Sequence, residues 1–170
     1  MGINGIMAFG YEAIGNAIYT FDVDNLPGAT QFSPGGGDFW GGMIGDIDDQ
    51  NIMYGVTFYG NQLYSLDLTT GAQTLIGTVG GLSQTAGLAA DLTEGTYYAS
   101  SADQLWMLDV ENATATNIGP HGTSLMIAMA GDGEGNLWGY DMTIDHFYSI
   151  DKTTGAATDI GSIGINVGYA

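Results

Sequence analysis

Two short acid-rich segments of the chain contain the residue types that bind hard cations. They are Asp46-Ile47-Asp48-Asp49 and Asp132-Gly133-Glu134-Gly135-Asn136, where oxygen-bearing side chains alternate with other residues. This alternation around glycine resembles part of a calcium loop, but the twelve-residue EF-hand pattern does not follow. Acidic turns between strands have the same composition without a metal. Two alternatives therefore stay open: plain turns and no cofactor, which is the favoured interpretation, or a calcium site at Asp46, Asp48 and Asp132.

A second group of candidate residues surrounds Trp40, in the segment Gly37-Asp38-Phe39-Trp40-Gly41. Asp38, Phe39 and Trp40 combine a carboxylate with two aromatic side chains, which can stack on a sugar or contact a protein partner. The other repeats of the chain, described below, have no Trp at this place. Two interpretations stay open: these residues bind a ligand at the mouth of the fold, or Trp40 caps the hydrophobic core.

Other kinds of chemistry find little support in the residue types. The chain has no Cys, which excludes disulfides, thiol catalysis and thiolate metal sites. Its two histidines, His121 and His146, are not at a metal-ligand spacing and fall in different expected turns. The sequence contains no Gly-x-Ser-x-Gly elbow and no phosphate-binding loop with Lys. Nothing marks a pair among the 19 acidic residues for glycoside hydrolysis, so no catalytic residue is predicted.

The charge balance limits the partners. The 19 acidic residues are opposed by a single Lys and no Arg, and the formal net charge is −18. Such a chain has nothing with which to neutralise the phosphates of nucleic acid or to dock on anionic lipid. It has no run of 18 apolar residues, so membrane insertion is not expected either. The expected partner is a neutral or cationic protein or a glycan.

An internal repeat organises these residues. Four segments share one pattern of apolar and aromatic residues that ends in Asp: Ile18–Asp22, Leu63–Asp67, Leu105–Asp109 and Phe147–Asp151. The four Asp residues are spaced by 45, 42 and 42 positions. Upstream of each stands an aromatic residue followed by a small one, at Phe9, Tyr54, Tyr98 and Trp138. Glycine- and alanine-rich runs, such as Gly42–Gly45 and Gly87–Ala90, precede the aromatic positions.

Each repeat therefore has four short apolar runs separated by turns rich in Gly, Asp, Asn and Thr. No run shows a helical period, and four short strands in about 42 residues describe a blade of a β-propeller. The sequence predicts an all-β protein, a single four-bladed β-propeller over residues 1–170 with four antiparallel strands per blade. The expected blades cover about 1–35 together with 165–170, then 36–80, 81–122 and 123–164.

The two ends of the chain predict how the ring closes. Residues 1–32 contain three of the four strands of a blade, and the missing inner strand is matched by the last residues, 165–170. The C-terminal strand is thus expected to complete the N-terminal blade, which leaves no exposed inner edge. If the strand enters a neighbouring chain instead, the result is an eight-bladed dimer or an open polymer, and the chain is then a homo-oligomer.

The repeated residues have a structural interpretation. Two of the repeated Asp residues begin the motif Asp-x-Thr-Thr-Gly, at Asp67 and Asp151, where the carboxylate can accept backbone N–H groups in a hairpin turn. This interpretation is favoured over a ring of carboxylates that binds cations. The repeated aromatic residues are expected to pack between blades, because they recur at fixed strand positions.

The unit Leu-Tyr-x-Leu-Asp-x-x-Thr-Gly-Ala-x-Thr-x-Ile-Gly spans Leu63–Gly77 and, with Phe147 first, extends to Gly161. It resembles repeats of secreted bacterial β-propeller proteins, many of unknown function. The resemblance implies a propeller outside the cell or on its surface, and it transfers no catalytic residue. The expected function is a non-catalytic interaction or structural module. The alternatives are a lectin-like propeller that binds a carbohydrate or small ligand, and a strand-swapped subunit of an extracellular assembly. A glycan hydrolase or lyase is the least favoured alternative.

Overall fold

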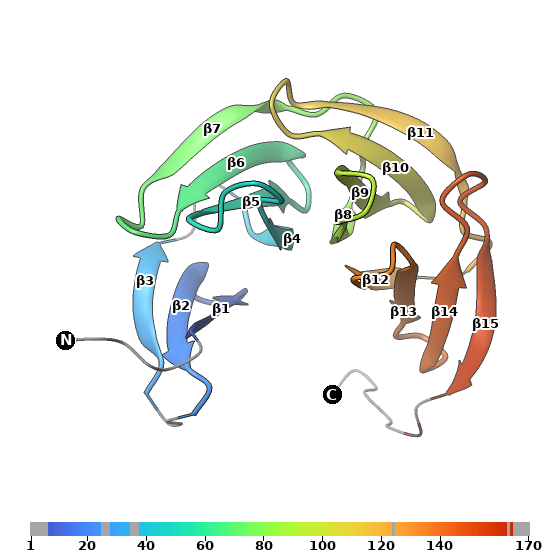
Figure 1. The fold of residues 1–170 in the computed structure, drawn as a ribbon, viewed down its shortest axis with the longest axis horizontal. Coiled ribbons are helices and arrows are strands. Elements are labelled where there is room, and N and C mark those ends of the chain that lie inside the picture. The colour runs from blue at the N-terminus through green and yellow to red at the C-terminus, as the bar shows by residue number, and fades with distance from the viewer. Residues whose placement is uncertain (1–6, 25–27, 35–37, 124, 163, 165–170) are drawn as a thin grey trace.

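The structure is a computed structural model that describes residues 7–24, 28–34, 38–123, 125–162 and 164. These residues form β-strands and no helix, and the strands make four antiparallel sheets arranged around a common centre (Figure 1). Without a helix, the described residues contain no candidate for a membrane-spanning helix. The prediction of an all-β, four-bladed β-propeller is confirmed.

The blades follow one another along the chain. The first blade contains β1 (Met7–Glu12), β2 (Ala17–Asp22) and β3 (Thr30–Pro34). The second contains β4 (Trp40–Gly45), β5 (Ile52–Thr57), β6 (Gln62–Asp67) and β7 (Gln73–Thr78). The third contains β8 (Thr85–Asp91), β9 (Thr96–Ser101), β10 (Gln104–Asp109) and β11 (Thr114–Pro120). The fourth contains β12 (Met126–Gly131), β13 (Leu137–Asp141), β14 (His146–Ile150) and β15 (Ala157–Ser162).

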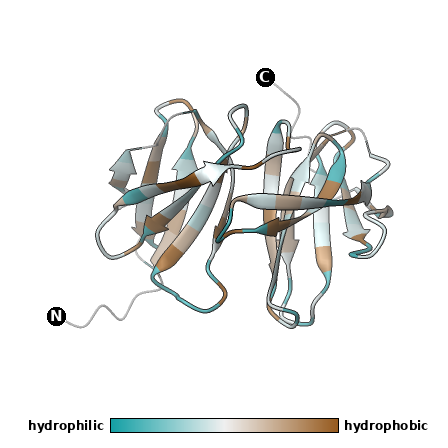
Figure 2. Cartoon of the chain, turned by 90° about the horizontal axis from the view of Figure 1, so that it is seen from above, coloured by the Kyte–Doolittle hydropathy of each residue, from teal (hydrophilic) through white to brown (hydrophobic). Residues whose placement is uncertain are grey.

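The sheets of the second and third blades bury both of their faces against neighbouring blades, and the repeated motif explains how. In β6, the fully buried Leu63 belongs to the core between the second and third blades. Leu66, on the opposite face of the strand, belongs to the core between the first and second blades, where Tyr64 packs beside it. In β10, Leu105 belongs to the core between the third and fourth blades, and Leu108 belongs to the core between the second and third. Because side chains alternate along a strand, the motif Leu-Tyr-x-Leu supplies two inter-blade cores at once. Figure 2 shows the hydrophobic segments within the strands.

Irregularities in pairing also repeat from blade to blade. The outer pair of strands has a register shift at the same motif position in all four blades, at Ile18/Tyr19, Leu63/Tyr64, Leu105/Trp106 and Phe147/Tyr148. The inner pair has one at Trp40/Gly42, Thr85/Gly87 and Met126/Ala128. A bulge bends a strand and increases its right-handed twist, so every blade acquires the same twist.

The inner strands β4, β8 and β12 lie close together at the centre, where glycine makes the approach possible (Figure 1). A Cβ atom on Gly41 would lie 1.7 Å from the carbonyl oxygen of Thr85 in the next blade. One on Gly87 would lie 2.9 Å from the backbone nitrogen of Met129. Backbone atoms cannot rotate away as a side chain can, so the small inner residues set the spacing of the ring.

The first blade has three strands in the described part of the chain. The pairing of Gly10 with Tyr19 corresponds to that of Gly55 with Tyr64, which places β1 at the position of β5 in the second blade. The inner strand that β4 provides in the second blade has no counterpart among the described residues of the first. The predicted closing strand, residues 165–170, lies outside the described residues, so closure within one chain or between chains stays a prediction.

The hairpin turns between the outer two strands confirm the structural interpretation of the repeated Asp residues. Asp67 Oδ1 accepts hydrogen bonds from the Thr69 backbone N–H, the Thr69 hydroxyl and the Thr70 N–H, at 2.7, 2.6 and 3.0 Å. Asp151 makes the same three contacts in the fourth blade, with Thr153 and Thr154. These hydrogen bonds hold the pKa of Asp67 and Asp151 below the usual value, with the hydroxyl bond as the largest cause. The turns use carboxylates as local caps.

Substituting Gly41 tests the packing of the inner strands. In G41A the new methyl group meets a neighbouring backbone carbonyl, so we expect a loss of about 1–3 kcal/mol in the free energy of unfolding, as for other overpacked cores. G45A is the matched control, because it lies in the same strand and its Cβ would meet nothing within 4 Å. Urea denaturation measures both variants. Equal stability of G41A and G45A would contradict the close approach of β4 and β8.

Candidate functional site

Trp40 lies in the core between the first two blades. Its side chain is 3% exposed and stacks between Tyr11 and Tyr64, with ring centroids 6.2 and 6.0 Å away. A Cβ atom on Gly55 would lie 2.1 Å from the Trp40 ring, which explains the small residue after the aromatic one in this blade. Of the two interpretations that the sequence left open for Trp40, this placement favours core packing.

Asp38 and Phe39 have separate roles beside it. Asp38 Oδ2 accepts the backbone N–H groups of Tyr59 and Gly60 at 2.9 and 3.2 Å, and Oδ1 accepts the N–H of Phe39 at 2.8 Å. The carboxylate thus ties the segment before β4 to the β5–β6 turn. The Phe39 ring stacks on Phe58 with centroids 5.0 Å apart, and the Tyr59 ring meets both edge-on. Tyr59 is 65% exposed, so this aromatic group reaches the surface.

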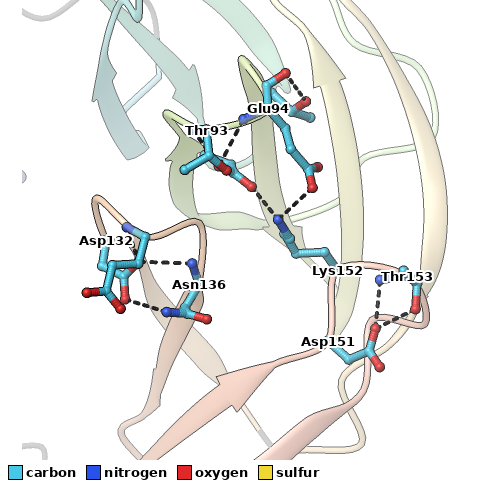
Figure 3. A network of polar contacts seen from close by, with 10 residues as sticks. Thr93, Glu94, Asp132, Asn136, Asp151, Lys152 and Thr153 are labelled. Carbon is cyan, nitrogen blue, oxygen red and sulfur yellow. Dashed lines mark hydrogen bonds and ion pairs between the residues drawn. The ribbon is translucent and has the colours of Figure 1, made fainter.

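The three predicted calcium ligands lie in two different turns. Asp46 and Asp48 belong to the β4–β5 turn of the second blade, and Asp132 belongs to the β12–β13 turn of the fourth. Asp132 Oδ2 accepts hydrogen bonds from Asn136 Nδ2 and Trp138 Nε1 at 2.9 and 3.0 Å (Figure 3 shows the Asn136 contact). These bonds, chiefly those from Asn136, hold its pKa well below the usual range. The described residues contain no cluster of three or more acidic, His or Cys side chains placed to hold a metal.

Asp46 anchors its own turn. Its Oδ1 accepts the N–H groups of Asp48 and Asp49 at 2.7 and 2.8 Å. Burial alone would raise the pKa of Asp46, but hydrogen bonds from the Tyr54 hydroxyl and from these N–H groups lower it below the usual value. The turn is also fixed from the next blade, because the Tyr97 hydroxyl accepts the Ile47 N–H at 2.7 Å.

A surface cavity of about 450 Å³ opens beside this turn, between the second and third blades. Tyr54 and Tyr97, one from each blade, form part of its lining and meet edge-to-face, with centroids 5.7 Å apart. The exposed Met107 adds an apolar contact on the third blade. The full lining comprises Asp46, Asp48, Tyr54, Gly95, Thr96, Tyr97, Met107, Leu108, Asp109, Val110, Glu111, Thr114 and Thr116.

The four carboxylates of the cavity differ in what they already bind. Asp109 is occupied by its own turn: Oδ1 accepts the N–H groups of Glu111 and Asn112 at 3.0 Å, and Oδ2 accepts Asn112 Nδ2 at 2.9 Å. Asp46 is occupied as described above. Within the part of the chain that the structure describes, no hydrogen bond ends on the carboxylates of Asp48 and Glu111. These two exposed side chains, one from the second blade and one from the neighbouring third blade, are the negative groups of the cavity that can receive a ligand.

The tyrosines between them stay uncharged over the physiological range. Burial and the neighbouring carboxylate of Asp46 raise the pKa of Tyr54 well above its usual value of 10. Burial also raises that of Tyr97, which feels the negative charges of Asp46 and Asp48. Each hydroxyl therefore remains a hydrogen-bond donor and acceptor beside the carboxylates. The site offers negative charge, aromatic edges and hydroxyl groups.

Sequence reasoning found Asp46 and Asp48 but missed the third-blade half of the cavity. Glu111 and Asn112 replace the Thr-Thr of the repeated turn, Thr69-Thr70 in the second blade. That departure from the repeat was the available signal. The contribution of Tyr97 could not be read from spacing, because its hydroxyl serves the turn of another blade.

Lys152, the single Lys or Arg of the chain, lies at the next junction. Its ammonium group binds Asp91 and also Glu94 Oε1, the latter at 3.0 Å, and so joins the fourth blade to the third (Figure 3). Asp91 is fully buried and also accepts the Thr93 N–H at 2.8 Å. The Lys152 ammonium, as the largest cause, holds the pKa of Asp91 well below the usual range. We interpret this network as an inter-blade contact, since it binds protein groups on every side.

Comparison with solved structures supports the fold. A structure of a nidogen/laminin complex matches with a TM-score of 0.73 and 15% identity, over 94% of this chain and 62% of that one. A protein of unknown function from Bacteroides thetaiotaomicron matches with a TM-score of 0.69 and 18% identity, over 94% of this chain and 42% of that one. Virginiamycin B lyase from Staphylococcus aureus matches with a TM-score of 0.62 and 11% identity, over 94% of this chain and 53% of that one.

The chain thus spans less than two thirds of the length of each of these proteins. No protein-family model matches the chain, and no curated protein does either. At this level of identity the likeness shows a shared fold, and function has to be argued from the site.

Replacing Lys152 tests the ion pair. K152M removes the cation but keeps much of the side-chain length, and it leaves the buried Asp91 carboxylate without its partner. We expect a clear fall in Tm at pH 7, whereas K152R keeps the charge and the contact and should resemble the wild type. Since the folded-state pKa of Asp91 is lowered, its stabilising effect is present above the usual value of 3.8 and fades below it. A Tm of K152M equal to that of the wild type at pH 7 would contradict this contact.

Proposed function

We propose that this propeller is a non-catalytic interaction module of the cell exterior, and that the cavity between its second and third blades receives a positively charged group of a partner protein. One observation carries the proposal: Asp48 and Glu111, whose carboxylates are free of hydrogen bonds among the described residues, flank a pair of tyrosines in a 450 Å³ cavity. A Lys or Arg side chain would find a counter-charge on each side and aromatic edges between them.

The charge of the whole chain supports a cationic partner. At −18, the chain attracts positive groups from a distance. Its own Lys152 is held by Asp91 and Glu94 at another junction. A Lys or Arg side chain in the cavity must therefore come from outside these 170 residues. Salt should weaken the association, because exposed charges are screened.

The state of the turn carboxylates favours binding over catalysis. Asp46, Asp109 and Asp132 are held at lowered pKa by hydrogen bonds within their turns, whereas a general acid needs a raised one. The structural neighbours include both a nidogen/laminin complex and a lyase, at 15% and 11% identity, so the shared fold is compatible with either function and the site has to decide between them. The placement outside the cell rests on the resemblance to secreted propeller repeats.

A charge-neutralising variant tests the cavity. Isothermal titration calorimetry at low salt with a hexalysine and a hexa-arginine peptide should detect binding to the wild type. We expect D48N/E111Q to lose at least about tenfold in affinity, equivalent to about 1.4 kcal/mol. The control D24N/E134Q removes the same number of exposed charges outside the cavity and should bind almost as the wild type does. Equal losses in both variants would mean attraction by net charge alone and would contradict the cavity.

The exposed aromatic group favours a second candidate, a lectin-like function. Phe39, Phe58 and Tyr59 form a cluster with centroids 4.8–5.6 Å apart, and Asp38 fixes the backbone that carries two of them. A rigid, exposed tyrosine can stack on the C–H face of a sugar ring and donate a hydrogen bond to it. This surface would bind a neutral glycan without help from the acidic cavity.

Neutral oligosaccharides test this second candidate. If it is right, cellohexaose or chitohexaose should change the intrinsic fluorescence in a saturable manner, and Y59A should abolish the change. L92A is the control, because Leu92 is 60% exposed in another blade and its loss removes apolar surface of a different kind. Absence of saturable binding by the wild type, or an equal effect of L92A, would exclude the cluster as a site for these sugars.

A further inference from the structure

His121 occupies a core position that is apolar in the second blade. It follows β11 at the junction of the third and fourth blades and is 2% exposed. Val79, which is 1% exposed, has the same place after β7. The two backbones are equivalent, since the N–H of His121 donates to Asp103 O and that of Val79 to Asn61 O, both at 2.9 Å. One blade thus has a titratable group where another has a valine.

Ser100, next to the His121 ring, also differs from its counterpart in the second blade. Ser100 pairs with Leu105 across the sheet as Val56 pairs with Leu63 in the second blade. Val56 and Val79 belong to one hydrophobic cluster. In the third blade, His121 Nε2 lies 3.2 Å from the hydroxyl oxygen of Ser100, which is 1% exposed. A pair of valines is therefore replaced by a hydrogen-bonded pair of polar side chains in the same geometry.

The ring of His121 also holds the next blade. Its Nδ1 lies 3.0 Å from the carbonyl oxygen of Gly155, in the β14–β15 turn. The carbonyl oxygen of His121 accepts the N–H of Ala157 at 3.0 Å. With Nε2 on Ser100, the neutral ring donates from Nδ1–H to Gly155 and accepts the Ser100 hydroxyl proton. The Nδ1 atom and the carbonyl oxygen of His121 thus bind the fourth blade, while Nε2 and the backbone N–H bind the third.

The surroundings of the ring disfavour a positive charge. Burial lowers the pKa of His121 below its usual value of 6.5, and the hydrogen bond to Gly155 and the charge of Asp103 oppose this only in part. Asp103 Oδ1 is itself occupied by the Thr123 N–H and hydroxyl. From β9 the ring contacts Ser100, and from β12 the carbonyl oxygen of Met126 contacts the Ser100 hydroxyl; neither residue carries a charge.

The charged groups of the facing turn are engaged elsewhere. The β14–β15 turn contains Asp151 and Lys152, which bind Thr153 and Thr154 and the carboxylates of Asp91 and Glu94. A proton on Nε2 would turn this atom from acceptor to donor. The Ser100 hydroxyl would then donate only to Met126 O, with which it already makes a 3.4 Å hydrogen bond, and the buried positive charge on the ring would have no carboxylate in contact.

We propose that His121, with Ser100, is an acid-sensitive lock between the third and fourth blades, closed while the ring is neutral and loosened when it is protonated. The sign follows from linkage: because the unfolded chain binds the proton more readily, stability is complete above about pH 6.5 and falls as the pH decreases below it. The fall approaches about tenfold in the folding equilibrium constant per pH unit, down to the lowered pKa of the folded state.

Urea denaturation at pH 7.5, 6.5 and 5.5 tests the lock, in a range above the ordinary pKa values of carboxylic acids. The variant S100V/H121V installs the valine pair of the second blade. We expect the folding constant of the wild type to fall by up to about tenfold relative to this variant between pH 7.5 and 5.5. H121Q, which cannot be protonated, gives the same test if the double variant folds poorly. Hydrogen exchange of the Ala157 amide, corrected for its intrinsic rate, should accelerate over the same range in the wild type alone.

H146Q is the control, because His146 is the other histidine and is partly exposed beside Asp159, 2.8 Å away. It should retain the pH dependence that His121 generates. If the wild type, S100V/H121V and H121Q all show the same pH dependence, the lock is wrong. If H146Q alone removes it, the pH response belongs to the His146–Asp159 pair and the proposal is overturned.

Discussion

The burial of sheet faces between neighbouring blades is the constraint on which the rest of this structure depends. A small sheet with two apolar faces has no stable surface of its own, so each blade requires a neighbour on either side. The alternating side chains of the Leu-Tyr-x-Leu motif meet this need in the second and third blades. Glycine in the inner strands then lets the sheets converge at the centre, where Gly41 approaches Thr85 at backbone distance.

Because apolar side chains fill the faces, charge is confined to the turns and the junction rims. Most of the carboxylates described here bind backbone N–H groups of their own turn, as Asp67, Asp132 and Asp151 do. Local capping of this kind needs no cation, which is how a chain with a net charge of −18 can fold with a single Lys. Two features stand out against this background: the Lys152 ammonium, which binds Asp91 and Glu94, and the carboxylates of Asp48 and Glu111, which line the cavity without accepting a hydrogen bond from the described residues.

The repeat made the architecture predictable, since periodic runs of apolar residues state both the number of strands and the number of blades. The capping role of Asp67 was also readable, because it depends on neighbours within three residues. The site was not readable to the same extent. Whether Trp40 faces solvent or the core depends on Tyr11 in the previous blade, and the cavity joins Asp48 to Glu111 across a blade boundary. Contacts of this kind are set by how two sheets pack, which the pattern within one repeat does not contain.

The junctions between blades also differ in their contents. Tyr97 reaches the Ile47 N–H at one junction, while Lys152 and His121 occupy the next. Blades that share one repeated pattern therefore have edges that each fit one neighbour. The contacts at these edges thus help to specify the order of the blades, in addition to the chain that connects them. A rearranged gene that exchanged the second and third repeats would encode the same strands and turns but would bring together edges that do not match.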